Sequence, residues 1–204
     1  MAEIVLFHSA LGPRRGIQVA ADILRKGGHT VHTPDLFRGE AVFDETGKAV
    51  AYCRNLGMAE LLGRAREAVD ALPDNLVYAG CSLGGTFAAN LAANRPNARA
   101  ALILHASPIP EAVRKPEWPA GVPVQIHRMT QDRWVSSDSL RRLTRFIRKS
   151  GAACEQFDYP GSGHLFADPD LPDFDPAAAD LMWQRILEFL SELDQGLDDM
   201  ASAE

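Results

Sequence analysis

The sequence predicts an α/β fold of three layers, with about six mostly parallel strands flanked by helices. Two observations support this prediction. Short apolar runs rich in β-branched residues alternate with segments of helical periodicity along the whole chain. No linker of low complexity interrupts the 204 residues, a length that suits one doubly wound sheet. We therefore expect a single domain over residues 1–195, followed by a polar and frayed tail over 196–204.

The expected strands are short and apolar, as is typical of parallel strands that helices cover on both faces. They span residues 4–8, 29–33, 76–80, 100–105, 123–129 and 154–159. A helix is expected in every gap between them, because a crossover between parallel strands usually contains one.

Four of the expected helices show an apolar stripe at the i, i+3, i+4 spacing. The stripes cover residues 17–24, 58–72, 140–147 and 182–193. Gly27-Gly28 and Pro73 end the first two helices, and Asp175-Pro176 begins the last. We interpret the stripes as surfaces that face the core.

A candidate nucleophile lies in the turn after the third expected strand, where residues 80–85 read GCSLGG. A sharp strand-to-helix turn of the GxSxG type strains its central residue and requires small residues two positions before and after it. Gly80 and Gly84 meet this requirement around Ser82, whereas the frame centred on Cys81 would place Leu83 at a crowded position. Ser82 is therefore the predicted nucleophile, although a serine at this place could also be an ordinary helix N-cap.

A serine nucleophile needs a histidine base and a carboxylate that orients the base. Asp132 follows the expected strand 123–129, and His164 lies in a glycine-rich loop after the last expected strand. The chain order Ser, Asp, His is the order used by α/β-hydrolases. Read one at a time, Asp132 could form an Asx turn and His164 could be a solvated loop residue. His8 and His105 compete as bases, but neither follows the last strand.

The oxyanion that forms during acyl transfer needs two backbone N–H donors. One should come from Leu83, the residue after the nucleophile, and the other from the loop after the first strand. We expect Ala10 to supply the second donor. Gly12 gives this loop the freedom to turn, and Pro13 suits the first position of the helix that follows.

Four segments carry a resemblance to a known family: residues 80–85 (GCSLGG), 34–37 (PDLF), 131–132 (QD) and 163–166 (GHLF). Over nearly its whole length the chain resembles the dienelactone hydrolase family of α/β-hydrolases. The resemblance implies a single-domain hydrolase with a three-layer α/β-hydrolase fold that cleaves small lactones or carboxylic esters without metal or organic cofactor. It also implies that Ser82, Asp132 and His164 form the catalytic triad, and that Ala10 and Leu83 form the oxyanion hole. Separately from the resemblance, we expect a monomer or homodimer.

Two positions depart from the family pattern. The best-known members have a cysteine nucleophile in a GYCLGG string, where this chain has Ser82. They also have an arginine four residues after the catalytic histidine, which holds the substrate carboxylate, where this chain has Asp168. An ordinary serine esterase is therefore expected. A thioesterase and a non-catalytic binding protein with a hydrolase fold are the alternatives.

Two irregular segments are expected to border the site. The long segment 38–54 is predicted as a loop that roofs the pocket, with Phe43 and Tyr52 facing substrate, or else as a solvated excursion. Trp118, in the proline-rich segment 108–120, either lines the pocket or pins its own loop. The remaining candidates for substrate binding are Ser9, Arg38 and Arg54.

The composition argues against several functions. A net charge of −6 disfavours a nucleic-acid partner, which needs clustered positive charge. No apolar run is long enough to cross a bilayer, and the chain enters a strand directly without a signal-peptide pattern. Three cysteines at no metal-binding spacing suit a reducing compartment, so we expect a cytoplasmic protein with free thiols.

Overall fold

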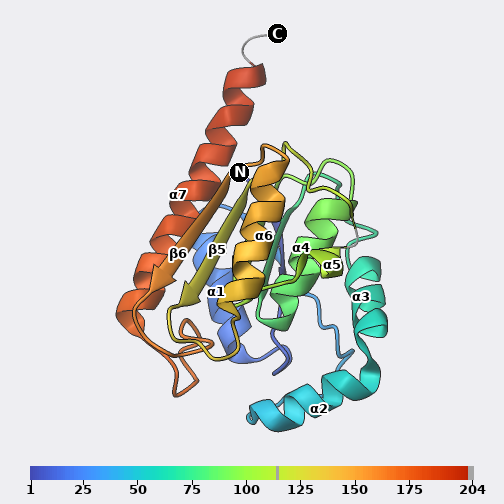
Figure 1. Ribbon diagram of the computed structural model, residues 1–204, viewed down its shortest axis with the longest axis vertical. Coiled ribbons are helices and arrows are strands. Elements are labelled where there is room, and N and C mark those ends of the chain that lie inside the picture. Colours follow the sequence, from blue (N-terminus) through green and yellow to red (C-terminus); the bar gives the residue numbers. More distant parts are fainter. Residues whose placement is uncertain (114, 202–204) are drawn as a thin grey trace.

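The computed structural model describes residues 1–113 and 115–201, and within them six strands form one parallel sheet (Figure 1). The strands are β1 (Glu3–Phe7), β2 (Thr30–His32), β3 (Val77–Cys81), β4 (Ala100–Leu104), β5 (Val124–Met129) and β6 (Cys154–Tyr159). Their order in the sheet is β2-β1-β3-β4-β5-β6. All six predicted strands are confirmed.

The register of the central strands brings their carboxyl ends to one edge. Phe7 at the end of β1 lies opposite Gly80, and Cys81 at the end of β3 lies opposite Leu104. Leu104 in turn lies opposite His127 of β5. The loops after these strands therefore meet at a single edge, which is where parallel α/β sheets bind their ligands.

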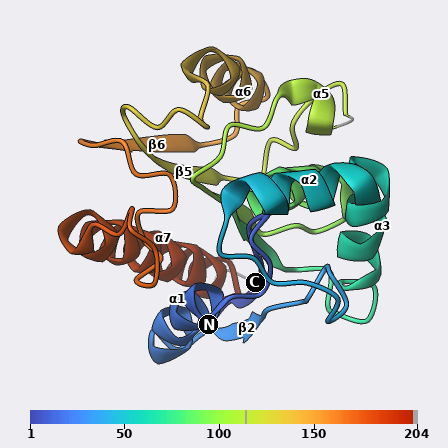
Figure 2. The same ribbon diagram turned by 90° about the horizontal axis from the view of Figure 1, so that it is seen from below.

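Helices cover both faces of the sheet and form the predicted three layers (Figure 2). On one face lie α1 (Arg15–Lys26) and α7 (Pro176–Ala201), which share a core with Ile4, Leu6 and Leu102. On the other face α3 (Met58–Glu67), α4 (Leu83–Asn94) and α6 (Ser137–Lys149) pack against residues such as Phe7 and Ile126. The short α5 (Pro110–Val113) packs beside α4. None of the helices in the described part of the chain is long and apolar enough to cross a membrane.

The segment expected to be a long loop contains a helix, α2 (Thr46–Leu56). Figure 1 shows α2 beyond the end of the sheet toward which β5 and β6 point. Only Ala49 and Cys53 of this helix are buried, so its apolar stripe is too narrow to stand out in the sequence. Gly57, at φ 84°, separates α2 from α3.

One helix end also differs from the prediction. The helix expected over residues 58–72 ends at Glu67, and hydrogen-bonded turns follow it up to Leu72. The last helix, α7, continues to Ala201, so its backbone includes part of the segment expected as a polar tail. Gly196 does not end it. The rest of the predicted tail, residues 202–204, lies outside the described residues.

Candidate active site

The turn between β3 and α4 holds Ser82 in a strained conformation. Its φ of 53° and ψ of −113° are unusual for a residue with a side chain. The Ser82 N–H donates to the Leu104 carbonyl oxygen over 2.8 Å, which ties the turn to the neighbouring strand. The strand, the positive φ and the helix that follows are the geometry expected of a nucleophile elbow, in which a hydroxyl is presented above the end of the sheet.

Three glycines make this turn possible because neighbouring atoms, mostly of the backbone, occupy the space where their side chains would be. An ideal Cβ on Gly80 would lie 2.2 Å from the carbonyl carbon and oxygen of Gly84. A Cβ on Gly84 would lie 2.4 Å from the Phe7 carbonyl oxygen, and one on Gly85 would lie 2.8 Å from the Ala106 Cβ. The first turn of α4 therefore packs directly on β1 and β3.

The three residues predicted as a triad lie in one hydrogen-bonded chain. The Ser82 Oγ lies 2.8 Å from the His164 Nε2, and the His164 Nδ1 lies 2.7 Å from the Asp132 Oδ2. Because a carboxylate accepts, the His164 Nδ1–H donates to Asp132, and the Nε2 is left free to accept the serine hydroxyl proton. The arrangement can therefore activate a serine for nucleophilic attack.

Both oxygens of Asp132 are used, and the residue is only 5% exposed. Its Oδ1 accepts the Trp134 N–H over 2.8 Å, while its Oδ2 accepts from His164. A carboxylate held at both oxygens in a buried place cannot rotate freely, so it fixes the plane of the imidazole.

The loop that carries His164 is fixed by its own hydrogen bonds. The His164 N–H donates to the Asp173 Oδ2 over 2.9 Å, and the Gln131 N–H donates to the Gly161 carbonyl oxygen over 2.9 Å. A Cβ on Gly163 would lie 2.7 Å from the Asp173 carbonyl oxygen, so the two loop segments touch there. The supporting role of Asp173 was not predicted.

His8 and His105, the alternative candidates for the base, are both buried and take no part in the hydrogen bonds of Ser82 and Asp132 that are described above. The buried His8 Nε2 accepts the Leu36 N–H over 3.0 Å, so its Nδ1 must be the protonated atom that donates to the Ser9 carbonyl oxygen. Burial lowers the pKa of His8. His105 is 2% exposed, and burial lowers its pKa well below the usual value. Both are thus neutral residues of the interior.

The loop that carries Ala10 begins close to the helix start that carries Leu83. The Phe7 and His8 carbonyl oxygens are 2.4 and 2.7 Å from the Cβ position of Gly84, so the loop after β1 begins against the first turn of α4. Among the described residues neither the Ala10 N–H nor the Leu83 N–H has a hydrogen-bond acceptor. An oxyanion hole requires N–H groups that are free to donate in this way.

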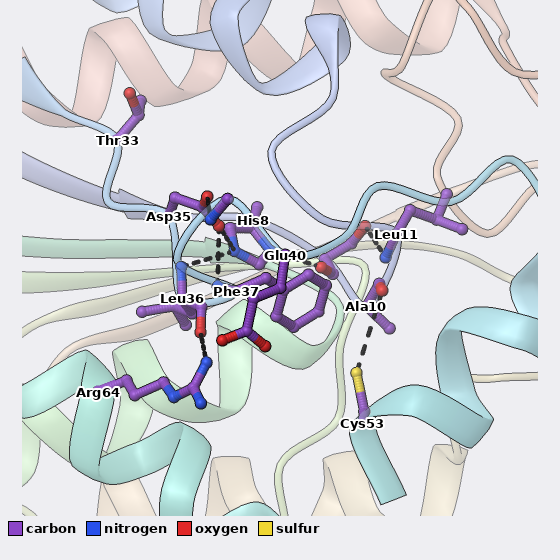
Figure 3. A network of polar contacts seen from close by, with 12 residues as sticks. His8, Ala10, Leu11, Thr33, Asp35, Leu36, Phe37, Glu40, Cys53 and Arg64 are labelled. Carbon is purple, nitrogen blue, oxygen red and sulfur yellow. Dashed lines mark hydrogen bonds and ion pairs between the residues drawn. The ribbon is translucent and has the colours of Figure 1, made fainter. Parts of the chain in front are cut away.

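A network of polar contacts holds the loop of Ala10 in place (Figure 3). The Leu11 N–H donates to the Ser9 Oγ over 3.2 Å, and the Cys53 thiol of α2 lies 4.0 Å from the Ala10 carbonyl oxygen. On the other side of His8, the Arg64 guanidinium of α3 donates to the Leu36 carbonyl oxygen over 3.0 Å. The expected substrate contact Ser9 is therefore a buried residue that shapes this loop.

A pocket of about 470 Å³ opens beside His164. Its lining residues come from the loop after β1, the segment before and at the start of α2, and the loops after β5 and β6: Leu11, Asp44, Thr46, Gln131, Arg133, Trp134, Ser162, His164, Leu165, Leu171, Pro172 and Asp173. Asp44 and Thr46 belong to the segment predicted to roof the site, so that segment does border the pocket. Trp134 was missed, because one tryptophan in a polar turn carries no sequence signal of its own.

The aromatic residues expected to face substrate pack on one another. The rings of Phe37 and Tyr52 lie 5.0 Å apart between centroids, and those of Phe43 and Tyr52 lie 5.2 Å apart. The Tyr52 hydroxyl donates to the Glu40 Oε2 over 2.8 Å. Neither Phe43 nor Tyr52 lines the pocket beside His164, and instead they hold α2 on the domain.

Three further candidates lie away from the pocket. Arg38 pairs with the Glu67 carboxylate over 2.7 Å, and Arg54 is an exposed residue of α2. Trp118 is buried in the core, where its Nε1–H donates to the Val122 carbonyl oxygen over 2.7 Å. Of the two roles considered for Trp118, the structure shows the pinning of its loop.

Cys81, the neighbour of Ser82, and Asp168, one of the two departures, both line a small cavity of about 30 Å³. Burial, with a smaller contribution from the Asp168 carboxylate, raises the pKa of the Cys81 thiol to about 12, so this thiol is a poor nucleophile near neutral pH. Asp168 faces the first turn of α1, where a Cβ on Gly16 would lie 2.2 Å from its Cγ. Asp168 does not line the pocket beside His164.

Comparison with known proteins identifies the family of this chain. The model of the dienelactone hydrolase family matches residues 1–193. Among proteins with curated descriptions, no sequence matches.

Solved structures are similar in fold at low sequence identity. A dienelactone hydrolase-like promiscuous phosphotriesterase from metagenomic libraries is 20% identical, with a TM-score of 0.79 over 95% of this chain and 87% of its own. Esterase 2 of Thermogutta terrifontis is 20% identical, with a TM-score of 0.66 over 94% of this chain and 83% of its own. Both share the α/β-hydrolase fold with this chain. The family match over almost the whole length shows that the chain belongs to the dienelactone hydrolase family.

Proposed function

We propose that this member of the dienelactone hydrolase family is a serine hydrolase that cleaves small carboxylic esters or lactones through an acyl-enzyme. The observation that carries the proposal is the continuous chain from the Ser82 Oγ to the His164 Nε2, 2.8 Å, and from the His164 Nδ1 to Asp132, 2.7 Å. A serine that caps a helix for structural reasons alone needs neither partner.

In the first half of the reaction, Ser82 attacks the carbonyl carbon while His164 takes the hydroxyl proton. The C–O bond to the leaving group then breaks, and His164 returns that proton to the departing oxygen. The Ala10 and Leu83 N–H groups stabilise the tetrahedral oxyanion by about 3 kcal/mol each. Asp132 stabilises the imidazolium that exists between the two proton transfers.

In the second half, water replaces the alcohol. His164 takes a proton from the water, whose oxygen attacks the acyl carbon, and then protonates Ser82 as the acid product leaves. For a lactone the alcohol and the acid belong to one molecule, so the product is a hydroxy acid.

The charges around the pocket favour neutral esters and lactones. Asp44 and Asp173 border it with carboxylates, of which Asp44 pairs with Arg14, and Arg133 borders it with a guanidinium. The position where other members hold the substrate carboxylate with an arginine is Asp168, which faces α1 instead.

The test compares two adjacent residues that could each act as nucleophile. Ser82→Ala should lower kcat for a small aryl ester by at least about a thousandfold while the protein remains folded. Cys81→Ala should retain activity within about threefold, because that thiol stays protonated near neutral pH. Ester hydrolysis is followed by absorbance and folding by circular dichroism.

A binding protein is separated from an enzyme by covalent labelling. A fluorophosphonate should label the wild-type protein at Ser82, and His164→Ala should abolish the labelling. Full activity in Ser82→Ala, or an absence of labelling in the wild type, would contradict the proposal. A panel of lactones, aryl esters and acyl thioesters then identifies the preferred leaving group.

A further inference from the structure

One wall of the pocket beside His164 is an indole. Trp134 is 47% exposed, and its ring lies 5.9 Å from the imidazole of His164 between centroids, tilted by 39°. The apolar residues that share this pocket with it are Leu11, Leu165, Leu171 and Pro172. An exposed tryptophan needs no explanation by itself, but this one lies next to the proposed base in a pocket of about 470 Å³.

The turn that carries Trp134 is hydrogen-bonded to Asp132 of the proposed triad. The Trp134 N–H donates to the Asp132 Oδ1 over 2.8 Å, on the carboxylate that orients His164. The flanking residue Val135 is buried, and its N–H lies 3.3 Å from the Asp132 carbonyl oxygen. The backbone of the tryptophan is therefore fixed relative to His164, while its side chain faces the pocket.

The direction of the reaction decides which half of a substrate meets this indole. His164 must reach the leaving oxygen with its Nε2 in order to protonate it, which requires about 3 Å between the two atoms. The atoms bonded to the leaving oxygen therefore lie beside the imidazole, on the side where Trp134 stands. The oxyanion donors Ala10 and Leu83 hold the other oxygen of the ester.

We propose that Trp134 determines specificity for the leaving group, by packing against a planar aromatic alcohol such as the phenol of a phenyl ester. The proposal rests on the proposed function and deepens it. The reaction is balanced by water: the bond from the acyl carbon to the phenol oxygen breaks, that oxygen takes a proton, and water supplies the hydroxyl of the acid. Aromatic pairs contribute enough beyond burial to change a rate constant by about two- to tenfold.

The experiment compares two esters whose leaving groups have similar acidity but different shape. Phenyl acetate offers a planar ring, and hexafluoroisopropyl acetate offers a branched fluoroalkyl group. In Trp134→Ala, kcat/KM for phenyl acetate should fall by about five- to tenfold. The fluoroalkyl ester should change by less than about twofold. Trp134→Phe keeps a ring in the pocket, so it should retain most of the preference for phenyl acetate.

A matched control removes an exposed apolar side chain elsewhere. Leu181 on α7 is 40% exposed and does not line the pocket, so Leu181→Ala should leave both esters unaffected. An equal loss for both esters in Trp134→Ala, not restored in Trp134→Phe, would show that the residue only supports the fold. Unchanged kinetics for both esters would show that the leaving group does not contact the indole. In either case hydrolysis by the wild type would still support the proposed function, whereas a wild type inactive on every ester would overturn both.

Discussion

The nucleophile turn, residues 80–85, and the segment over residues 38–57 border the same site but are held by different forces. In the turn, backbone atoms of Gly84 and Phe7 occupy the places of missing side chains at distances as short as 2.2 Å. In the segment, the contacts are ring packing between Phe43 and Tyr52 and hydrogen bonds that include exposed carboxylates. Residues 38–57 are also largely exposed.

The turn that positions Ser82 and the segment that borders the pocket are therefore constrained separately. A turn fixed by backbone contact has one solution, because the obstructing atoms cannot change rotamer. A segment fixed by side chains can exchange them one at a time at a modest cost in free energy. The pocket border is therefore the adaptable part of the site.

The largest expected effect comes from adding one methyl group to the turn. Gly80→Ala would place its Cβ 2.2 Å from backbone atoms of Gly84, so the protein should lose well over about 3 kcal/mol of stability or fail to fold. Urea unfolding followed by circular dichroism measures this loss. Gly63→Ala in α3 is the control, since nothing lies within 4 Å of its Cβ and helix propensity predicts a gain of about 0.5–1 kcal/mol. Equal free energies of unfolding in the two variants would show that backbone contact does not constrain Gly80.

A gradual loss of stability is expected when the pH is lowered, because His8, His105 and His127 are buried. Burial lowers the pKa of His8 and of His105, and it lowers that of His127 to about 3. The unfolded chain therefore binds more protons than the folded protein below about pH 6.5. The free energy of unfolding should be constant between about pH 8 and 7 and then fall as the pH decreases, with up to about 1.4 kcal/mol per pH unit from each histidine.

Urea titrations at a series of pH values test this expectation. A stability that stays constant from about pH 7 to 5 would show that these histidines accept protons in the folded protein. A variant of one histidine tests its own share. Replacing His127 should remove its share of the fall between about pH 6.5 and pH 3, because its pKa is lowered to about 3.

The smallest effect is expected in the segment. Tyr52→Phe removes the hydrogen bond to Glu40 but keeps the ring beside Phe37. Stability should fall by no more than about 1 kcal/mol, and kcat/KM should change by less than about twofold. A loss as large as that of Gly80→Ala would show that the segment is as constrained as the turn.

The sequence predicted the parts that are governed by local steric rules. The strands, the turn around Ser82 and the places of Asp132 and His164 follow from apolar runs, glycines and chain order. The helix α2 was missed because it buries only Ala49 and Cys53, and its stability comes from contacts with residues far away in the sequence.

Single side chains outside motifs were predicted less well. Trp118 and Trp134 both occur in irregular segments, yet one is buried with its N–H paired and the other faces the pocket. Nothing local distinguishes them, since the outcome depends on which elements pack above each loop. The expectation that Phe43 and Tyr52 face substrate failed for the same reason.

The inward orientation of Asp168 limits how this enzyme could be redesigned. Grafting an arginine onto that position, to imitate relatives that grip a carboxylate, would insert a long guanidinium beside a cavity of about 30 Å³ and against the first turn of α1. The new guanidinium would start from a position that does not line the pocket beside His164. A variant designed to bind a substrate carboxylate should instead carry its new arginine or lysine at the border of the pocket beside His164, where Arg133 lies.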